Sequence, residues 1–393
     1  MDPDVHFLRI EFLEKSKRLS TLGEGTFGDV GLYQTPFGEL VIKETKIKSK
    51  SLGYPPDLLV EIDSLLKFRA SNHIVQLKGI CLDPNHRKGY LMLEKLDTNL
   101  SSWSRRNSFT VRVAYLDRLI RQIGSTLSLM HKFQMVHNDL KPNNILIQQN
   151  SNGPLFKLAD FGKSFRVTND GSPYGALKKY CPPEHTNIFS AEYWGFLMCC
   201  LEFLVSPDEF VRERDLHQFQ NKYIHRGKFE VASYLKNNLS TEQYRSIPES
   251  FWKFAEPICQ DLDAEISTGL EAINCPLEKS LVDTIQKKVL QPVPLHPKFE
   301  EQFGDFRKML NTVDSGRHFK RFSQLLNIFL HRIDQEYSKI KIDPVTLKCY
   351  ADVVRVIIAK NRARSYLYFD TQAEFLKFER AFLEVLGFQI WVV

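Results

Sequence analysis

The segment of residues 136–162 limits the possible folds of this chain more than any other, because it holds two acidic residues, each within a short motif. Asp139 stands in the motif H-N-D-L-K-P-N-N, and Asp160 stands in D-F-G after a short apolar run. Residues 145–147 predict a strand, and residues 150–153 predict a tight turn. Such a hairpin returns both aspartates to one edge, where one carboxylate can accept a hydroxyl proton and the other can hold Mg²⁺ on nucleotide phosphates.

A second phosphate-binding signal lies between two β-rich runs near the N-terminus, at Gly23, Gly25, Gly28 and Val30. Glycine is needed there because side chains would keep backbone N–H groups from closing over phosphate oxygens. The spacing G-x-G-x-x-G alone is equally compatible with a dinucleotide-binding fold. The segment that follows predicts a strand carrying Lys43 rather than a helix, and this argues against the dinucleotide fold.

Composition sets the broad class of the protein. The 393 residues are enough for two or three domains, and 43% hydrophobic with 25% charged residues is ordinary for a globular protein. The formal net charge of +6 is spread along the chain. It is compatible with acidic partners or phosphate ligands, and it is no signature of nucleic-acid binding.

The seven cysteines show no C-x-x-C pair and no spacing typical of metal ligands. An odd, dispersed set without an N-terminal signal sequence predicts reduced thiols in a cytoplasmic or nuclear protein. The most apolar run, residues 194–205, is interrupted by Glu202 and is too short to span a membrane. We therefore expect no association with a membrane.

These motifs resemble those of eukaryotic-type serine/threonine protein kinases, and the G-E-G-T-F-G loop is similar to the G-E-G-T-Y-G of cyclin-dependent kinases. The resemblance implies an α+β, two-lobed protein-kinase fold with a β-rich N-lobe and a helical C-lobe. It places the kinase domain at residues 15–299, with the N-lobe at about 15–96 and the C-lobe at about 97–299. A small all-helical domain is expected to follow at residues 300–393. Residues 5–19 are expected to form a helix ahead of the first strands.

The resemblance also implies an ATP- and Mg²⁺-dependent phosphotransferase that acts on protein hydroxyls. Asp139 is expected to orient the acceptor hydroxyl and take its proton, while Lys141 stabilises the transferring phosphoryl group. Asn144 and Asp160 are the expected Mg²⁺ ligands. His137 is expected to be structural, with hydrogen bonds to the backbone.

Phosphate binding by Lys43 is expected to depend on a paired glutamate, as in the kinase family. Glu61 lies at the matching position of an amphipathic segment that begins after two prolines. Asp57 and Asp63 are competing candidates on the same predicted helix.

The hinge of the nucleotide site is expected from Glu94 to Leu96, whose backbone would meet the adenine base. Asn99 lies where related kinases often place a polar residue that binds the ribose. The side chains in this segment are not diagnostic, and simple strand packing is the alternative role for them.

Three positions depart from the family pattern and keep a second hypothesis open. Asn138 replaces an arginine that commonly grips a phosphate on the activation loop. Leu177 replaces a threonine that steadies the catalytic residues, and Glu192 stands where an aspartate is usual. The alternative is a pseudokinase or scaffold that binds nucleotide or partner proteins without phosphoryl transfer. Phosphorylation of a small molecule or lipid is a third option.

Three amphipathic segments after residue 299 predict a small helical bundle. The last segment resembles the end of a cyclin box at Glu379, Phe382, Leu383, Leu386 and Phe388. A generic helical extension is the open alternative, since the acidic pair expected after Lys360 is missing. A cyclin-like domain would pack on the helix that carries Glu61 and activate the kinase in cis, at an effective concentration of roughly millimolar. Neither the substrate nor the oligomeric state follows from the sequence.

Overall fold

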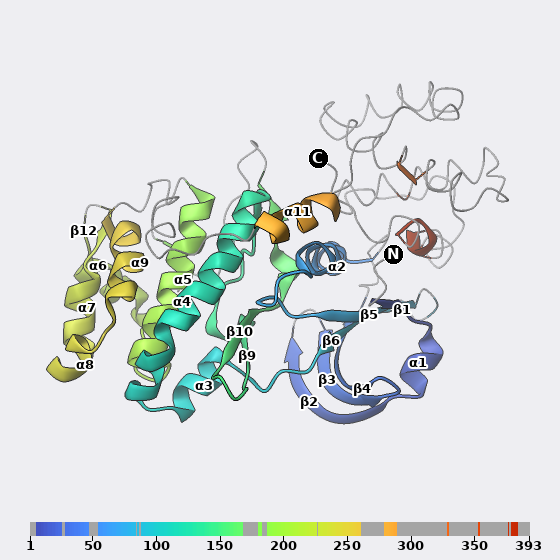
Figure 1. Ribbon diagram of the computed structural model, residues 1–393, viewed down its shortest axis with the longest axis horizontal. Coiled ribbons are helices and arrows are strands. Elements are labelled where there is room, and N and C mark those ends of the chain that lie inside the picture. Colours follow the sequence, from blue (N-terminus) through green and yellow to red (C-terminus); the bar gives the residue numbers. More distant parts are fainter. Residues whose placement is uncertain are drawn as a thin grey trace, which may run out of the picture. The chain divides into compact units, whose positions relative to one another are not determined.

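Two units make up the structure, a computed structural model (Figure 1). The sheet unit comprises residues 1–67, 76–95 and 285–393, and the helical unit comprises residues 68–75 and 96–284. The structure describes residues 5–25, 28–46, 54–83, 85, 88–167, 180–182, 187–225, 227–260, 279–288, 328–329, 353, 376 and 379–383.

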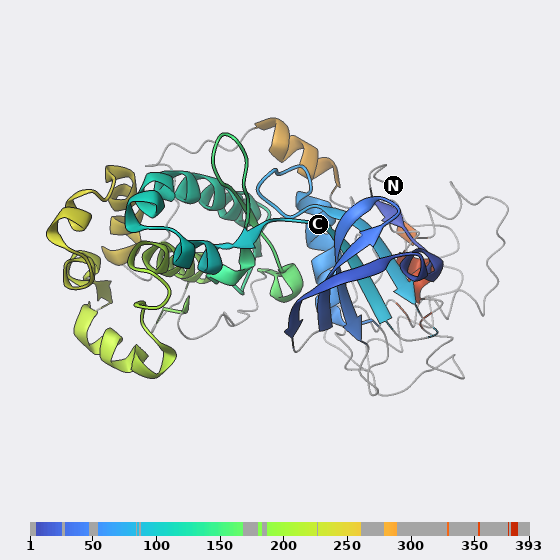
Figure 2. The same ribbon diagram turned by 90° about the horizontal axis from the view of Figure 1, so that it is seen from below.

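Alternating apolar and polar residues near the N-terminus form a sheet of six strands, which is strongly curved (blue strands in Figure 2). The strand order is β1-β5-β6-β4-β3-β2, with β1 parallel to β5 and every other pair antiparallel. The strands are β1 His6–Phe7, β2 Lys17–Gly25, β3 Gly28–Thr35, β4 Gly38–Lys46, β5 Leu77–Asp83 and β6 Lys88–Glu94.

The helix predicted for residues 5–19 is wrong for most of its length. Only α1, Ile10–Glu14, is helical, and β1 and the start of β2 replace the rest. The cause is tertiary packing, because Leu8, Ile10 and Phe12 cover the buried cluster on this sheet that includes Leu40 and Ile42. The backbone groups of the edge strand β1 bond to β5, whereas in a longer helix they would bond to one another.

The helix predicted after the two prolines is present as α2, Pro56–Phe68. A proline at the first helical position suits a helix start, since its missing N–H would have no partner there. Leu58, Ile62 and Leu65 are buried. A Cβ atom added at Gly89 of β6 would lie 2.3 Å from the Leu58 side chain, so glycine allows α2 to approach the sheet this closely.

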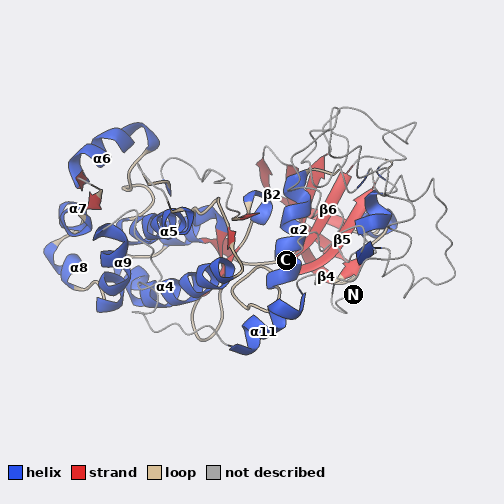
Figure 3. Ribbon diagram, turned by 90° about the horizontal axis from the view of Figure 1, so that it is seen from above, coloured by secondary structure: helices blue, strands red, loops and turns tan. Residues whose placement is uncertain are grey.

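The helical unit is built around α4, Phe109–Lys132, and α5, Ile188–Val205, which pack against each other (Figure 3). Its other elements are β7 Thr98–Asn99, α3 Leu100–Arg106, β8 Met135–Val136, η1 Pro142–Asn144, β9 Ile145–Gln148, β10 Leu155–Leu158, η2 Phe161–Lys163, β11 Phe165–Arg166, η4 Glu213–Asp215, α6 Leu216–Tyr223, β12 Ile224–His225, β13 Lys228–Phe229, α7 Val231–Asn238, α8 Thr241–Arg245 and α9 Glu249–Gln260. A further helix, α11, spans Lys279–Lys288.

The two central helices are buried for different reasons. The predicted apolar face of α4 is entirely buried, and it comprises Leu116, Leu119, Ile120, Ile123, Leu127 and Met130. In contrast, α5 is apolar on all sides, and by length and composition alone it could cross a membrane. Since 89% of it is buried inside the structure, it serves as the core helix of this unit.

The sheet unit includes a short piece of the C-terminal region, and most of residues 300–393 lie outside the described residues. Residues 379–383 are helical, and the Phe382 ring packs at a tilt against Phe329 with ring centroids 4.8 Å apart. The buried Glu379 carboxylate accepts a hydrogen bond from the Tyr54 backbone N–H at 2.8 Å. Arg380 donates to the Leu82 carbonyl at 3.0 Å, so this piece contacts both the start of α2 and the end of β5.

Candidate active site

Lys43 and Glu61 form an ion pair within the sheet unit. The Lys43 Nζ atom lies 2.7 Å and 2.9 Å from the two carboxylate oxygens of Glu61. Both side chains are largely buried, so neither charge can be left alone without a large desolvation penalty. Asp63, one of the competing candidates, pairs with Lys67 on its own helix.

The glycine-rich segment runs from β2 into β3, next to the strand that carries Lys43. Val30 lies directly opposite Lys43 in the register of β3 and β4. At Gly28, with φ of +153°, an added Cβ would lie 1.6 Å from the Glu44 carbonyl oxygen, so the backbone itself requires glycine. Among the described residues, an added Cβ at Gly23 meets no atom within 4 Å, so packing within that part of the chain does not explain this glycine. Gly25 ends β2.

The predicted hinge residues are partly engaged by other contacts. Glu94 closes β6, where its backbone N–H and its carboxylate both bond to the backbone of Gln76. Leu96 begins the next segment, and its backbone is the remaining predicted contact for adenine. The Asn99 side-chain oxygen accepts from the Ser102 N–H and caps α3, so ribose binding by Asn99 would have to use its amide nitrogen.

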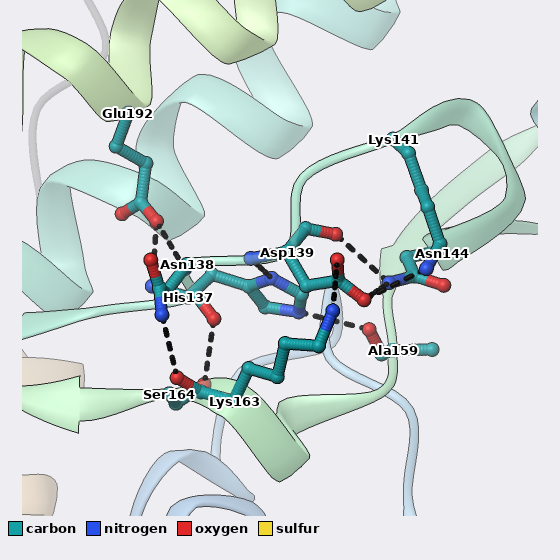
Figure 4. Close-up of polar contacts among 9 residues, drawn as sticks. All are labelled: His137, Asn138, Asp139, Lys141, Asn144, Ala159, Lys163, Ser164 and Glu192. Atoms are coloured by element: carbon teal, nitrogen blue, oxygen red, sulfur yellow. Dashed lines mark hydrogen bonds and ion pairs between the residues drawn. The ribbon is translucent and has the colours of Figure 1, made fainter. Parts of the chain in front are cut away.

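The predicted catalytic loop is anchored by Glu192 of the core helix α5 (Figure 4). One of its carboxylate oxygens accepts from the backbone N–H groups of His137 at 2.6 Å and of Asn138 at 2.9 Å. The other accepts from His131 Nε2 at 2.7 Å. The extra methylene of glutamate therefore reaches the loop backbone from this position.

His137 joins the two acidic segments. Its Nε2 atom bonds to the Ala159 carbonyl at 2.9 Å, and its Nδ1 atom accepts from the Asp139 N–H at 3.3 Å (Figure 4). The ring is completely buried and packs edge-on against Phe161. These contacts give His137 the structural role that the sequence predicts.

The Asp139 carboxylate is 3% exposed and is held by several donors. Lys141 Nζ lies 2.7 Å from its Oδ2 atom. The Asn144 amide nitrogen donates to the Asp139 carbonyl at 2.8 Å and to Oδ2 at 3.1 Å. Charge-assisted hydrogen bonds of this kind hold a carboxylate in one orientation, which suits a group that receives a proton.

The hairpin of β9 and β10 brings Asn144 next to the second acidic segment, as the sequence predicts. Ile145 pairs with Leu158, and the Ala159 N–H donates to the Asn144 carbonyl at 2.9 Å. Asp160 has φ of +64°, a left-handed conformation that aspartate adopts more readily than most residues.

The pair Asn144 and Asp160 suits a hard cation by its donor chemistry. Because the Asn144 amide nitrogen is committed to Asp139, its amide oxygen is the atom that can face a metal. An amide oxygen and a carboxylate are ligands that Mg²⁺ accepts, with phosphates and waters completing the octahedron.

Two described residues of the predicted activation loop, Tyr180 and Ser164, are held by hydrogen bonds. Tyr180 is buried and its hydroxyl donates to Glu202 at 2.8 Å, and burial raises the pKa of this tyrosine well above its ordinary value. Ser164 is buried and donates to the His137 carbonyl at 3.3 Å. Leu177 lies outside the described residues.

Comparison with known proteins decides the family. Residues 16–275 match the family described as the protein kinase domain. This chain belongs to the protein kinase family. The six-stranded sheet and the helical unit fit the two-lobed fold of protein kinases.

The relatives of this kinase include cyclin-dependent kinases. Cyclin-dependent kinase 11.1 of Caenorhabditis elegans is 28% identical over 55% of this chain and 31% of its own length. Cyclin-dependent kinase C-2 of Oryza sativa subsp. japonica is 30% identical over 43% of this chain and 36% of its own length. Aurora/IPL1-related protein kinase 2 of Caenorhabditis briggsae is 28% identical over 55% and 71%. This kinase thus spans about a third of the first two relatives.

Lys163 is a residue of the site that the sequence analysis missed. Its Nζ atom lies 2.9 Å from Oδ1 of Asp139 (Figure 4). The Asn138 amide nitrogen donates to the Lys163 carbonyl at 3.2 Å. Asn138, which replaces the arginine of the family pattern, therefore still links the two segments. The sequence could have indicated this role, because Lys163 directly follows the D-F-G motif of the predicted metal ligand Asp160.

Replacing Glu192 with alanine should destabilise this kinase by at least about 3 kcal/mol, because the buried His137 N–H and the half-buried donors of Asn138 and His131 would lose their acceptor. Glu192→Gln should have an intermediate effect, since an amide nitrogen cannot accept. The exposed Glu249→Ala is the matched control and should leave the free energy of unfolding close to that of wild type. Denaturant unfolding measures all three, and equal losses for Glu192→Ala and the control would refute the anchoring role.

Proposed function

We propose that this kinase transfers the γ-phosphoryl group of Mg-ATP to serine and threonine hydroxyls of proteins. The observation that carries the proposal is the Asp139 carboxylate, which is buried, fixed by Lys141 and Asn144, and joined through His137 to the segment of Asp160. A lysine two residues after the aspartate is typical of serine/threonine kinases within the family.

In this proposal each group has one task. Lys43, held by Glu61, binds nucleotide phosphates, and the backbone at Gly23, Gly25 and Gly28 covers them. Mg-ATP, when bound, supplies the phosphoryl group and the metal that neutralises its charge.

The residues of the helical unit would position the metal and the acceptor. Asn144 and Asp160 hold the metal. Asp139 orients the acceptor hydroxyl and takes its proton, while Lys141 balances the charge that develops on the phosphoryl oxygens.

The scaffold hypothesis is not favoured. Glu192, although it replaces the usual aspartate, makes the contacts that anchor the predicted catalytic loop. Asn138 bonds to the Lys163 carbonyl, where the usual arginine would bind a phosphate. Neither departure removes a group that acts on ATP or metal. In this proposal, activity therefore does not depend on phosphorylation of the activation loop.

The cytoplasmic or nuclear location remains a prediction.

Transfer of labelled γ-phosphate to matched peptides that differ only in Ser, Thr or Tyr tests this proposal. Wild type should label the serine and threonine peptides, and Asp139→Asn should lower the rate at least about 100-fold, since proton transfer loses its acceptor. Asp117→Asn, at an exposed position of α4, is the control and should act like wild type. Labelling of tyrosine alone, or equal rates in wild type and Asp139→Asn, would contradict the proposal.

We further propose regulation in cis by the C-terminal region. The supporting contacts are those of Glu379 with the Tyr54 N–H and of Arg380 with the Leu82 carbonyl. Tyr54 directly precedes the prolines that begin α2, and α2 carries Glu61. Fixing the start of this helix would favour the arrangement in which Glu61 holds Lys43.

The contact should also depend on pH. Burial raises the pKa of Glu379 to about 8, and the hydrogen bond from Tyr54 partly opposes this rise. The other ionisable groups that face this contact are Tyr54, Arg380, Asp83 and Cys81. Because Glu379 binds its proton more tightly in the folded than in the unfolded chain, its contribution to stability falls as pH rises from about 4.5 to about 8.

Glu379→Ala should lower stability by about 1–3 kcal/mol, because the Tyr54 N–H loses its acceptor, and it should raise the KM for ATP. Glu379→Gln should flatten the fall in stability between pH 5 and pH 8, about the window set by the shifted pKa. The exposed Glu39→Gln is the control in the same unit. Denaturant unfolding and ATP titration measure these effects. A destabilised Glu379→Ala with unchanged kcat and KM would refute regulation in cis.

A further inference from the structure

Both carboxylate oxygens of Asp139 are covered by ammonium groups. Lys141 and the Asn144 amide occupy Oδ2, while Lys163 lies 2.9 Å from Oδ1 (Figure 4). The aspartate is only 3% exposed. An acceptor hydroxyl that donates to this carboxylate must therefore compete with one of the two lysines.

The two lysines are held differently. Lys141 belongs to the catalytic loop and shares Oδ2 with Asn144, three residues further along the same loop. Lys163 comes from the other segment, and its side chain is 35% exposed, against 24% for Lys141. Lys163 is the one that can turn toward solvent, so Oδ1 is the oxygen that an acceptor can reach.

The backbone of Lys163 is fixed although its head group is accessible. The Asn138 amide donates to its carbonyl, and the buried Ser164 hydroxyl donates to the His137 carbonyl. The flexible side chain of Lys163 can thus change rotamer while its backbone stays in place, and its ammonium group stays within one side-chain length of Asp139. An anion bound beside the acceptor would meet it there.

Resting on the proposed kinase function, we propose that Lys163 makes this kinase selective for acceptor hydroxyls flanked by acidic residues. When Lys163 leaves Asp139, a buried carboxylate loses an ion pair, and a peptide with neutral flanks supplies no new partner for the ammonium group. A flanking glutamate, aspartate or phosphorylated residue supplies the replacement partner. The acceptor hydroxyl then takes the position on Oδ1, so binding of the flank and uncovering of the base occur together.

The test uses the full chain, Mg-ATP and three serine peptides that differ only in alanine, glutamate or lysine flanks. Wild type should show kcat/KM at least about tenfold higher for the glutamate peptide than for the alanine peptide, with most of the difference in KM. Lys163→Met should reduce this preference to about twofold or less and improve the alanine peptide. Lys163→Arg should keep the preference, because the charge remains.

Lys253→Met, at an exposed ion pair on α9, is the matched control and should keep the wild-type preference. Wild type alone gives a second measurement, since the preference should shrink from about 0.1 M to about 1 M salt, where screening shortens from about 10 Å to about 3 Å. A wild type without preference, a preference unchanged in Lys163→Met, or a salt-independent preference would overturn the role of Lys163. Failure to label any of the peptides would instead overturn the proposed kinase function.

Discussion

The Glu192 carboxylate is fully buried, yet it accepts hydrogen bonds from two consecutive backbone N–H groups and from His131. A buried carboxylate is stable only when such donors surround it. Because two of the donors are the backbone N–H groups of His137 and Asn138, the core helix α5 fixes the direction in which the chain enters the predicted catalytic loop. The hydrogen bonds of His137 and the position of Asp139 follow from that direction.

The fold shows how local constraints combine into one site. The hairpin register sets Asn144 beside Ala159, whose N–H donates to the Asn144 carbonyl, while the Ala159 carbonyl bonds to His137 Nε2. Each polar group in this network has a partner, which keeps Asp139 in one orientation. In the sheet unit, Glu61 of α2 pairs with Lys43, and Tyr54, just before α2, donates its backbone N–H to Glu379.

Sequence patterns predicted the elements whose periodicity is local, such as the apolar face of α4, the start of α2 and the hairpin before Asp160. They failed at residues 5–19, where pairing with β5 and packing on the sheet override a helical pattern. Lys163 was missed because its role depends on the path of the chain after D-F-G. The partner of Glu379, 325 positions earlier, had no local signal.

In the proposed function, Asp139 receives the acceptor proton beside a metal held by Asn144 and Asp160. A crystal structure of the full chain with Mg²⁺, a non-hydrolysable ATP analogue and a serine peptide with acidic flanks would locate both the metal and the acceptor. We expect metal on the Asn144 amide oxygen and the Asp160 carboxylate, and the serine hydroxyl in hydrogen-bond contact with Oδ1 of Asp139. A bound nucleotide with its metal on other residues, or a serine hydroxyl held away from Asp139, would contradict it.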